Sequence, residues 1–154
     1  MHPIDKKINE MGLILPNMPS PIANYVPFKI NQKSVFISGQ GPIIDGKNMY
    51  EGKVGQDLTI DDGINAAKLC CLNILSIIKS VCDNNWNNFQ EMIKIGGFVN
   101  CIDNFKDHPK VINGASDMLV EILGEKGKHS RFAVGANSLP INIAVEIEAI
   151  FILN

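Results

Sequence analysis

The sequence predicts an α/β (α+β) fold in which two helices pack on one face of a mixed β-sheet. Segments with strand and helix periodicity follow one another in the order β-β-(β)-α-β-α-β-β, which layers helices against a sheet. The chain has 154 residues, of which 45% are hydrophobic and 19% are charged. These values are typical of one globular domain, so we expect a single domain over residues 1–154.

The chain is expected to begin with an irregular lead-in over residues 1–24. Three prolines interrupt this stretch, namely Pro16, Pro19 and Pro21. Strands are then expected over residues 25–30 and 34–38, on either side of a turn at residues 31–33. Asp45-Gly46 predicts a second turn.

The first helix is expected to begin at Thr59, whose side chain can cap the free N–H groups of the first turn. Asp61 and Asp62 suit the positive end of the helix dipole. One face is apolar at helical spacing and should be buried. Its residues are Ala67, Cys70, Cys71, Ile74, Leu75, Ile77, Ile78 and Val81.

The middle of the chain predicts one strand and one helix. The strand covers residues 92–100, and its Gly96-Gly97 pair would admit a bulge or a close backbone approach. The second helix covers residues 108–123, and Gly124 should stop it.

Two further strands are expected over residues 131–138 and 142–153. On the final strand, one set of alternating side chains is apolar and should face the helices. The other set is Ala144, Glu146, Glu148, Ile150 and Ile152. Two helices can cover one face of the sheet only, and a solvated face would not usually carry two isoleucines side by side. We therefore hypothesise that the second face is buried against other copies of the chain.

Charge and motif content exclude several classes of function. A formal net charge of −2 gives no basic footprint, so no nucleic-acid partner is expected. No apolar run has the length of a membrane span and no secretory segment begins the chain, so we expect no membrane association and a cytoplasmic location. The four cysteines form no C-x-x-C pair and the three histidines have no metal-ligand spacing, so no metal is expected.

Arg131 is the first candidate for a functional residue, because it is the single arginine among 14 basic side chains. A guanidinium grips a carboxylate at two points, which a lysine ammonium does not. Two interpretations remain open. Arg131 either clamps a carboxylate-bearing ligand or forms a structural ion pair, for example with Glu125.

Glu146 is the second candidate, because it shares one face of a strongly apolar strand with Glu148. A buried carboxylate needs a partner or takes a raised pKa, and either suits proton transfer. The alternative is a structural pairing at a subunit contact, or exposure near its rim.

Weaker candidates lie elsewhere in the chain. The segment 38–42 (Ser-Gly-Gln-Gly-Pro) can present backbone groups to a small ligand, although an ordinary strand-ending turn has the same composition. It lacks the pattern of a phosphate loop. Cys101 has no neighbouring histidine in the sequence, so inert packing is expected of it. No nucleophile-elbow motif is present.

These segments together resemble the YjgF/Rid family, also labelled L-PSP endoribonucleases, over residues 25–152. The most specific part is an Arg, a Leu-Pro corner and an Ile/Val-Glu-Ile-Glu-Ala strand. It is present as Arg131-Phe132-Ala133-Val134, Leu139-Pro140 and Val145-Glu146-Ile147-Glu148-Ala149-Ile150. Further anchors are Asn24-Tyr25, Val35-Phe36-Ile37-Ser38-Gly39-Gln40, Phe98-Val99 and Phe105.

The resemblance implies a chorismate-mutase-like homotrimer with ligand clefts between subunits. It implies hydrolysis of reactive 2-imino or enamine acids to 2-keto acids and ammonia, without a cofactor. Arg131 would clamp the substrate carboxylate, and Glu146 would position the attacking water and exchange protons with it. The residues lining the cleft would be Tyr25, Ser38, Gly39, Asn113 and Ala133, with Asn113 one residue out of register.

The sequence also departs from the family pattern. Ala133 stands where many active deaminases carry Cys, and Phe132 stands where Ser is common. Asn24 and Ala23 replace the usual Pro and Gly. The alternative function is therefore a non-catalytic protein that binds a keto or amino acid. RNA cleavage or translation inhibition, the older family label, is disfavoured by the acidic charge.

Overall fold

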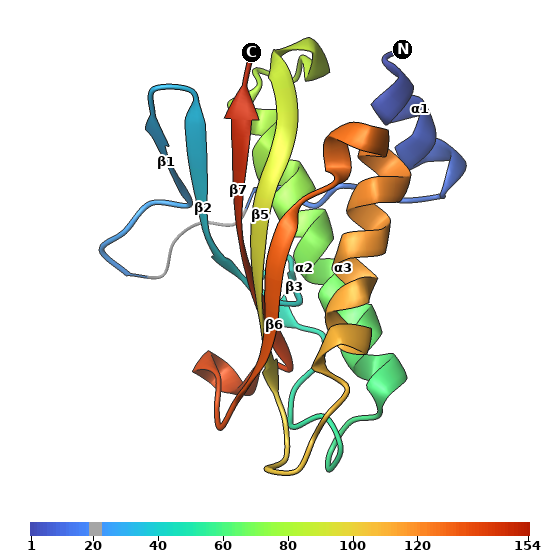
Figure 1. Ribbon diagram of the computed structural model, residues 1–154, viewed down its shortest axis with the longest axis vertical. Helices are drawn as coiled ribbons and strands as arrows, with labels where there is room; N and C mark the ends of the chain where they lie inside the picture. The colour runs from blue at the N-terminus through green and yellow to red at the C-terminus, as the bar shows by residue number, and fades with distance from the viewer. Residues whose placement is uncertain (19–22) are drawn as a thin grey trace.

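The computed structural model describes residues 1–18 and 23–154, and it confirms the predicted layer of helices on a mixed sheet (Figure 1). The elements in chain order are α1 (Pro3–Glu10), β1 (Phe28–Asn31), β2 (Ser34–Gln40), β3 (Ile43–Ile44), β4 (Lys47–Asn48), α2 (Ile60–Val81), η1 (Trp86–Asn88), β5 (Phe89–Asn100), α3 (His108–Leu123), η2 (Gly124–Gly127), β6 (Ser130–Ala136), η3 (Pro140–Asn142) and β7 (Val145–Leu153).

The main sheet has five strands in the order β1-β2-β7-β5-β6. Strands β5 and β6 are parallel, and the other neighbours are antiparallel. The two predicted turns are confirmed. The first joins β1 to β2, with Gln32 at a φ of 57°, and the second joins β3 to β4 through Asp45 and Gly46. The last strand, β7, therefore lies at the centre of the sheet, where both of its faces have to be covered or solvated.

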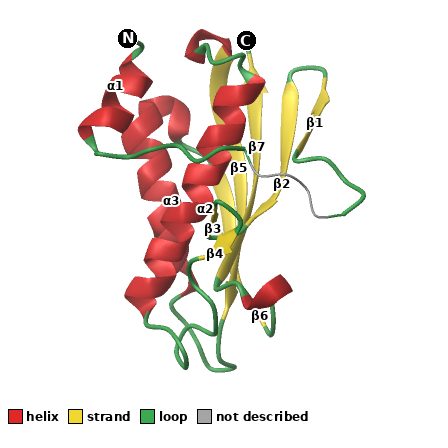
Figure 2. Ribbon diagram, turned by 180° about the vertical axis from the view of Figure 1, so that it is seen from behind, coloured by secondary structure: helices red, strands yellow, loops and turns green. Residues whose placement is uncertain are grey.

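Helices α2 and α3 lie side by side on one face of this sheet (Figures 1 and 2). The predicted cap of α2 is confirmed as a capping box, in which Thr59 and Asp62 each accept a hydrogen bond from the other's backbone N–H. By length and composition α2 could span a membrane, contrary to the sequence-based expectation. However, 61% of its most apolar 18-residue window is buried inside the fold, where the helix packs on β7 and β2.

The lead-in differs from the prediction, because residues Pro3–Glu10 form helix α1. Its buried side chains, Ile4 and Ile8, are four residues apart and dock on the core. Pro3 suits the first helical turn, where its missing N–H costs nothing. Two of the three prolines cited for an irregular lead-in, Pro19 and Pro21, lie outside the described residues.

The sequence predicted either a bulge or a close backbone approach at the glycine pair of β5. The structure shows the close approach. A Cβ at Gly97 would lie 2.7 Å from Cγ1 of Ile112 on α3, and one at Gly96 would lie 2.6 Å from Cε1 of Phe132. The irregular pairing of β5 with β7 falls earlier in the strand, before Ile95. The glycines thus let α3 approach one face of β5 and an aromatic ring cover the other.

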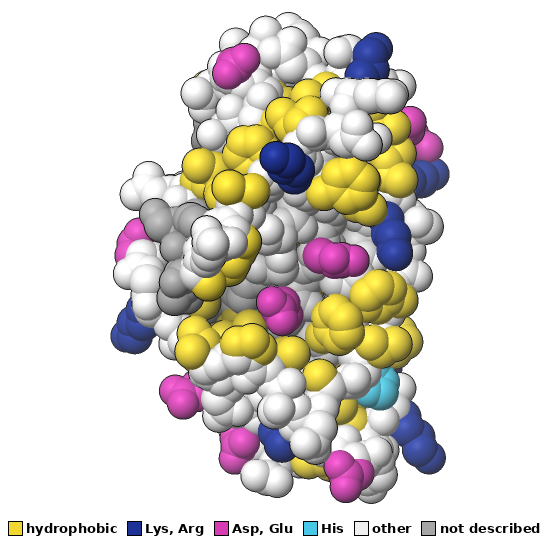
Figure 3. Space-filling model, turned by 90° about the vertical axis from the view of Figure 1, so that its left-hand side faces the viewer, with side chains coloured by type: hydrophobic (Ala, Val, Ile, Leu, Met, Phe, Trp, Pro, Cys, Tyr) yellow, Lys and Arg dark blue, Asp and Glu magenta, His cyan; other side chains and the backbone are white. Residues whose placement is uncertain are grey.

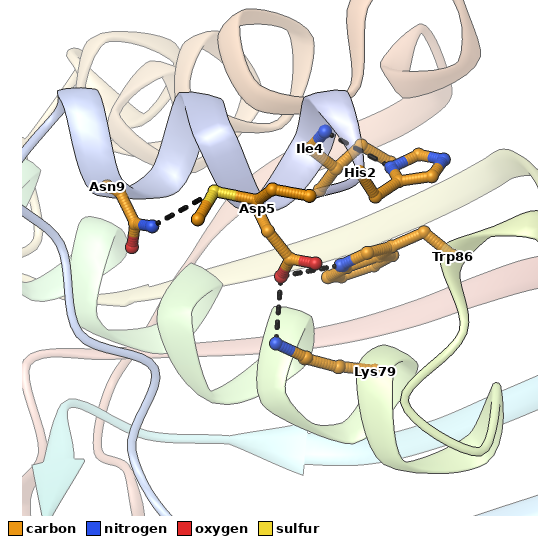
Figure 4. Close-up of polar contacts among 7 residues, drawn as sticks. His2, Ile4, Asp5, Asn9, Lys79 and Trp86 are labelled. Atoms are coloured by element: carbon orange, nitrogen blue, oxygen red, sulfur yellow. Dashed lines mark hydrogen bonds and ion pairs between the residues drawn. The ribbon is translucent and has the colours of Figure 1, made fainter.

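A polar contact fixes α1 to the rest of the fold (Figure 4). The Asp5 carboxylate accepts hydrogen bonds from Lys79 Nζ at 2.8 Å and from Trp86 Nε1 at 3.0 Å. Burial alone would raise the pKa of Asp5, but the hydrogen bonds from Lys79 and Trp86 outweigh it and hold that pKa below 3.8. One carboxylate therefore joins α1, the end of α2 and the residues before β5.

We expect Asp5→Asn to lower the free energy of unfolding at neutral pH by about 1–2 kcal/mol, because two charge-assisted hydrogen bonds are weakened. The folded-state pKa of Asp5 is lowered, so its contribution is present above pH 3.8 and is lost as the pH falls through the folded-state pKa. Urea denaturation at several pH values measures this. Glu10→Gln is the matched control, since its pair with Lys6 is exposed and should contribute little. An equal effect of both substitutions would contradict the account.

Candidate functional site

The sheet face opposite α2 and α3 carries both apolar and acidic side chains. In the described part of the chain no helix covers it (Figure 1). A space-filling view shows acidic side chains in a hollow between hydrophobic groups (Figure 3). The apolar residues that the strand register assigns to this open face are Phe36, Phe98, Phe132, Val134, Ile150 and Ile152. Phe36 and Val134 remain 45% and 42% exposed, respectively.

Glu146 lies within this open face, where β7 passes the bulge of β2. A Cβ at Gly39 would come within 3.0 Å of Glu146 Cδ and still closer to its Oε1, so the carboxylate packs directly on the glycine backbone in this position. Burial raises the pKa of Glu146, and the negative charge of Glu148 raises it further. The structure therefore brings two predicted site residues, Gly39 and Glu146, into contact. It also places a carboxyl group with increased proton affinity at the sheet surface.

An open groove of about 540 Å³ adjoins these residues and contains two more of the predicted ones, Tyr25 and Ser38. The Ser38 hydroxyl donates to the backbone carbonyl of Val26 at 2.7 Å, and this bond holds the Tyr25 segment against β2. Glu148 closes the side of the groove toward β7. The groove thus brings a tyrosine, a serine and the Glu148 carboxylate together on one surface.

Arg131 lies elsewhere, in the crease between β6 and α3. It pairs with Ile95, whose buried side chain faces the helices, so Arg131 points to the helix side of the sheet edge. Its Nη1 donates to Ser116 Oγ at 3.1 Å, and its Nη2 donates to the Pro109 carbonyl at 3.4 Å. The suggested ion pair with Glu125 is wrong, because Glu125 pairs with Lys128 at 2.9 Å.

Ser116 and His129 form a polar chain behind Arg131 that the sequence analysis missed. Ser116 Oγ lies 2.9 Å from His129 Nε2, and His129 Nδ1 lies 2.6 Å from the Gly127 carbonyl. A neutral His129 that donates from Nδ1 to this carbonyl leaves Nε2 to accept the Ser116 hydroxyl. The Ser116 oxygen then accepts from Arg131, so the chain fixes where the guanidinium lies.

The two halves of the predicted site are not brought together within one chain. Glu146 pairs with Phe98 and faces the open side, whereas Arg131 faces α3. Ala133 is on the same side as Arg131, since it pairs with Gly97. Asn113 lines a separate groove with Ile64 and Lys68 on the outer surface of the helices.

Two departures from the family pattern can now be placed. Phe132 covers the open face, with its ring 5.3 Å from that of Phe98 and 5.2 Å from Lys94 Nζ. It therefore reshapes the side that carries Glu146 and not the crease that carries Arg131. Cys101 Sγ lies 3.5 Å from His108 Nε2, so a histidine seven residues away in the sequence is its neighbour in the fold, and the sequence analysis missed it.

The geometry supports binding of a small anion and transfer of a proton, on two separate surfaces. Arg131 supplies a fixed positive charge with directed N–H donors. Glu146 supplies a carboxyl group with a raised pKa, which suits a general acid or base. The groove of Tyr25 and Ser38 gives a wall of mixed polarity beside Glu148. Within one chain these two functions lie on opposite faces of the sheet.

Comparisons with known proteins assign the family. Residues 5–151 match the family model described as "YjgF/chorismate_mutase-like, putative endoribonuclease". Protein TCP17 of Trypanosoma cruzi is 33% identical over 148 residues, which are 96% of this chain and 92% of TCP17. The crystal structure of Atu1372 from Agrobacterium tumefaciens, a protein of unknown function, is 40% identical with a TM-score of 0.92. That match covers 98% of this chain and 92% of Atu1372.

The chain therefore belongs to the YjgF/chorismate-mutase-like family, as the sequence resemblance indicated. A more distant structure, E. coli TdcF with bound serine, shares the fold. It is 21% identical with a TM-score of 0.61, and the match covers 88% of this chain and 93% of TdcF.

Glu146→Gln should stabilise the folded chain at neutral pH. The folded-state pKa of Glu146 is raised, so its ionisation opposes folding, and stability falls as the pH rises above 4.5 toward the folded-state pKa. Glutamine has nearly the same shape as glutamate and cannot ionise, so the substitution removes the free-energy cost of holding a charge at this position. Thermal unfolding at several pH values should therefore show a higher midpoint for the variant at pH 7, with the difference disappearing below pH 4.5. The exposed Glu51→Gln is the matched control, and a lower midpoint for Glu146→Gln at pH 7 would contradict the assignment.

Proposed function

We propose that this protein hydrolyses reactive 2-imino acids, or their enamine tautomers, to 2-keto acids and ammonia, in sites between the subunits of a homotrimer. The observation that carries the proposal is the separation of Arg131 and Glu146 on opposite sides of one sheet. If the open face of one copy docks beside the β6–α3 crease of the next, the two groups face one ligand.

The open face supports such docking. It exposes large apolar groups beside a partly buried carboxylate, and both features favour cover by another protein surface. Contact between two different surfaces, repeated around a threefold axis, closes a ring. The same contact would make three equivalent sites, each with Arg131 from one copy and Glu146 from another.

The chemistry suits these groups. Arg131 would hold the carboxylate of the imino acid at two points, with Ser116 keeping the guanidinium in place. Glu146 would accept a proton from water as the oxygen attacks the C=N carbon, and then deliver that proton to the nitrogen. Loss of ammonia from the tetrahedral intermediate leaves the keto acid. The raised pKa of Glu146 favours this exchange of protons.

The relatives support a role in binding a small ligand. The bound serine of TdcF carries a carboxylate and an amino group, the same functional groups that an imino acid presents or derives from. A binding protein without turnover is the second candidate, and Phe132 is the observation that favours it. Its ring lies on the open face beside Gly96 and Lys94, where it narrows the space near Glu148.

Turnover separates the two candidates. With imines generated in situ by an amino-acid oxidase, the wild type should speed keto-acid release. Arg131→Ala should lower kcat/KM by about 10- to 100-fold, because a charge-assisted contact is lost. Glu146→Gln should lower kcat by about 100-fold or more. Glu148→Gln is the matched control and should retain most activity. No acceleration by the wild type, together with keto-acid or amino-acid binding that Arg131→Ala abolishes, would favour the binding protein.

Assembly is tested by sedimentation at micromolar concentration. The wild type should be a trimer, and Val134→Asp should dissociate it, because a charge would be placed on the covered apolar face. Ile14→Asp is the control, since Ile14 is 85% exposed and follows α1 on the helix side. A stable wild-type monomer would contradict the trimer and with it the shared site.

A further inference from the structure

A cysteine and a histidine meet at one end of the molecule, away from the residues proposed to bind the imino acid. Cys101 follows β5, and His108 is the first residue of α3. Their side chains are joined by the 3.5 Å contact between Sγ and Nε2. The His108 ring is held edge-on by Phe105, with ring centroids 5.1 Å apart. The pair therefore has a defined geometry although neither residue belongs to the site described above.

The backbone next to this pair carries a glycine, Gly135, whose missing side chain leaves space for the thiol and the imidazole. A Cβ at Gly135 would lie 2.7 Å from His108 Nε2 and 3.0 Å from Cys101 Sγ, so the pair packs directly on the bare backbone of β6. Lys53 Nζ donates to the carbonyls of Cys101 and Asn137 and ties together the ends of β5 and β6. Gly135 thus leaves the space in which the thiol and the imidazole meet, and Lys53 joins the backbone segments on either side of it.

A small cavity gives access to the thiol. It measures about 240 Å³ and is lined by Cys101, Ile102, Asp103, Phe105, His108, Gly135, Ala136 and Asn137. The volume suits a molecule of a few heavy atoms. Lys53 and Asp103 act on the Cys101 thiol with opposite charges, so neither sign of ligand charge is clearly compensated there. A charged ligand would lose hydration on entering the cavity, and an uncharged ligand is therefore favoured.

We propose that Cys101 and His108 form a thiol–imidazole pair that adds to small, uncharged α,β-unsaturated carbonyl compounds. The Cys101 Sγ–H proton passes to neutral His108 Nε2 while sulfur bonds to the β-carbon of the acceptor. The π pair of the C=C bond moves to the α-carbon, which then takes the proton from Nε2. No leaving group, oxidant or reductant is required, and the product is a thioether on Cys101.

His108 is required because the thiol is otherwise weakly ionised. Burial raises the pKa of Cys101, even though Lys53 and a backbone hydrogen bond act in the opposite direction. A protonated thiol is a poor nucleophile, so the addition depends on a base within reach of Sγ. The other three cysteines are also buried, and burial raises the pKa of each of them. They serve as internal controls for access and for ionisation.

The test is acrylamide modification of the native protein at pH 7, followed by peptide mass spectrometry. Cys101 should be modified at least about tenfold faster than Cys70, Cys71 or Cys82. The substitution His108→Gln should lower the modification rate of Cys101 by at least about tenfold. Acrylate, the anionic analogue, should react with Cys101 more slowly than acrylamide after each rate is divided by that of N-acetylcysteine.

Gly135→Ala keeps the test independent of the His108 variant's folding. It should slow Cys101 as His108→Gln does, while far-ultraviolet circular dichroism confirms that each variant is folded. Equal Cys101 rates in the wild type and in folded His108→Gln would show simple exposure and overturn the proposal, as would a Cys101 rate no faster than that of Cys82. Imine turnover is not part of the readout, so the result is independent of the proposed deaminase.

Discussion

A β-sheet has two faces, and the fold of this chain depends on how each is covered. Helices α2 and α3 bury one face with side chains such as Ile74, Leu75 and Leu119, all fully buried. Strand β7 is central, so its outward side chains lie in the middle of the other face. Apolar groups left there favour association, because hydrophobic area is then removed from water. The alternation of β7 thereby connects the core of one chain to its contacts with others.

The same strand geometry divides the candidate site. Side chains in register on neighbouring strands share a face, so Arg131 goes with Ile95 and Glu146 goes with Phe98. A guanidinium fixed by Ser116 and a carboxyl of raised pKa are therefore the two halves of the proposed site, and they lie on opposite faces of one chain. The proposed trimer unites them, and this makes assembly a condition for activity.

The pattern of residues close together in the sequence predicted most of the helices and strands. The remaining features depend on how strands far apart in the sequence pair with one another. The capping box at Thr59 and the helix from His108 to Leu123 depend on nearby residues, so the sequence was sufficient for them. Helix α1 was missed because its core contact depends on Ile4 and Ile8 alone, too few for a periodic pattern. The side to which Arg131 points depends on the parallel pairing of β6 with β5, which the sequence does not specify. The Ser116–His129 and Cys101–His108 contacts likewise arise from the docking of α3 on β5 and β6.

Complementation between two variants of strongly reduced activity tests the shared site most directly. Arg131→Ala and Glu146→Gln chains would be co-expressed with different tags, and the mixed assemblies would be purified and assayed for keto-acid release. If Arg131 and Glu146 act from different copies, each purified mixed trimer should regain one of its three sites and so about a third of the wild-type activity, because each site needs one intact residue from each of two chains. Mixed trimers without activity, formed from variants that are correctly folded, would place both residues in one chain's site and contradict the account.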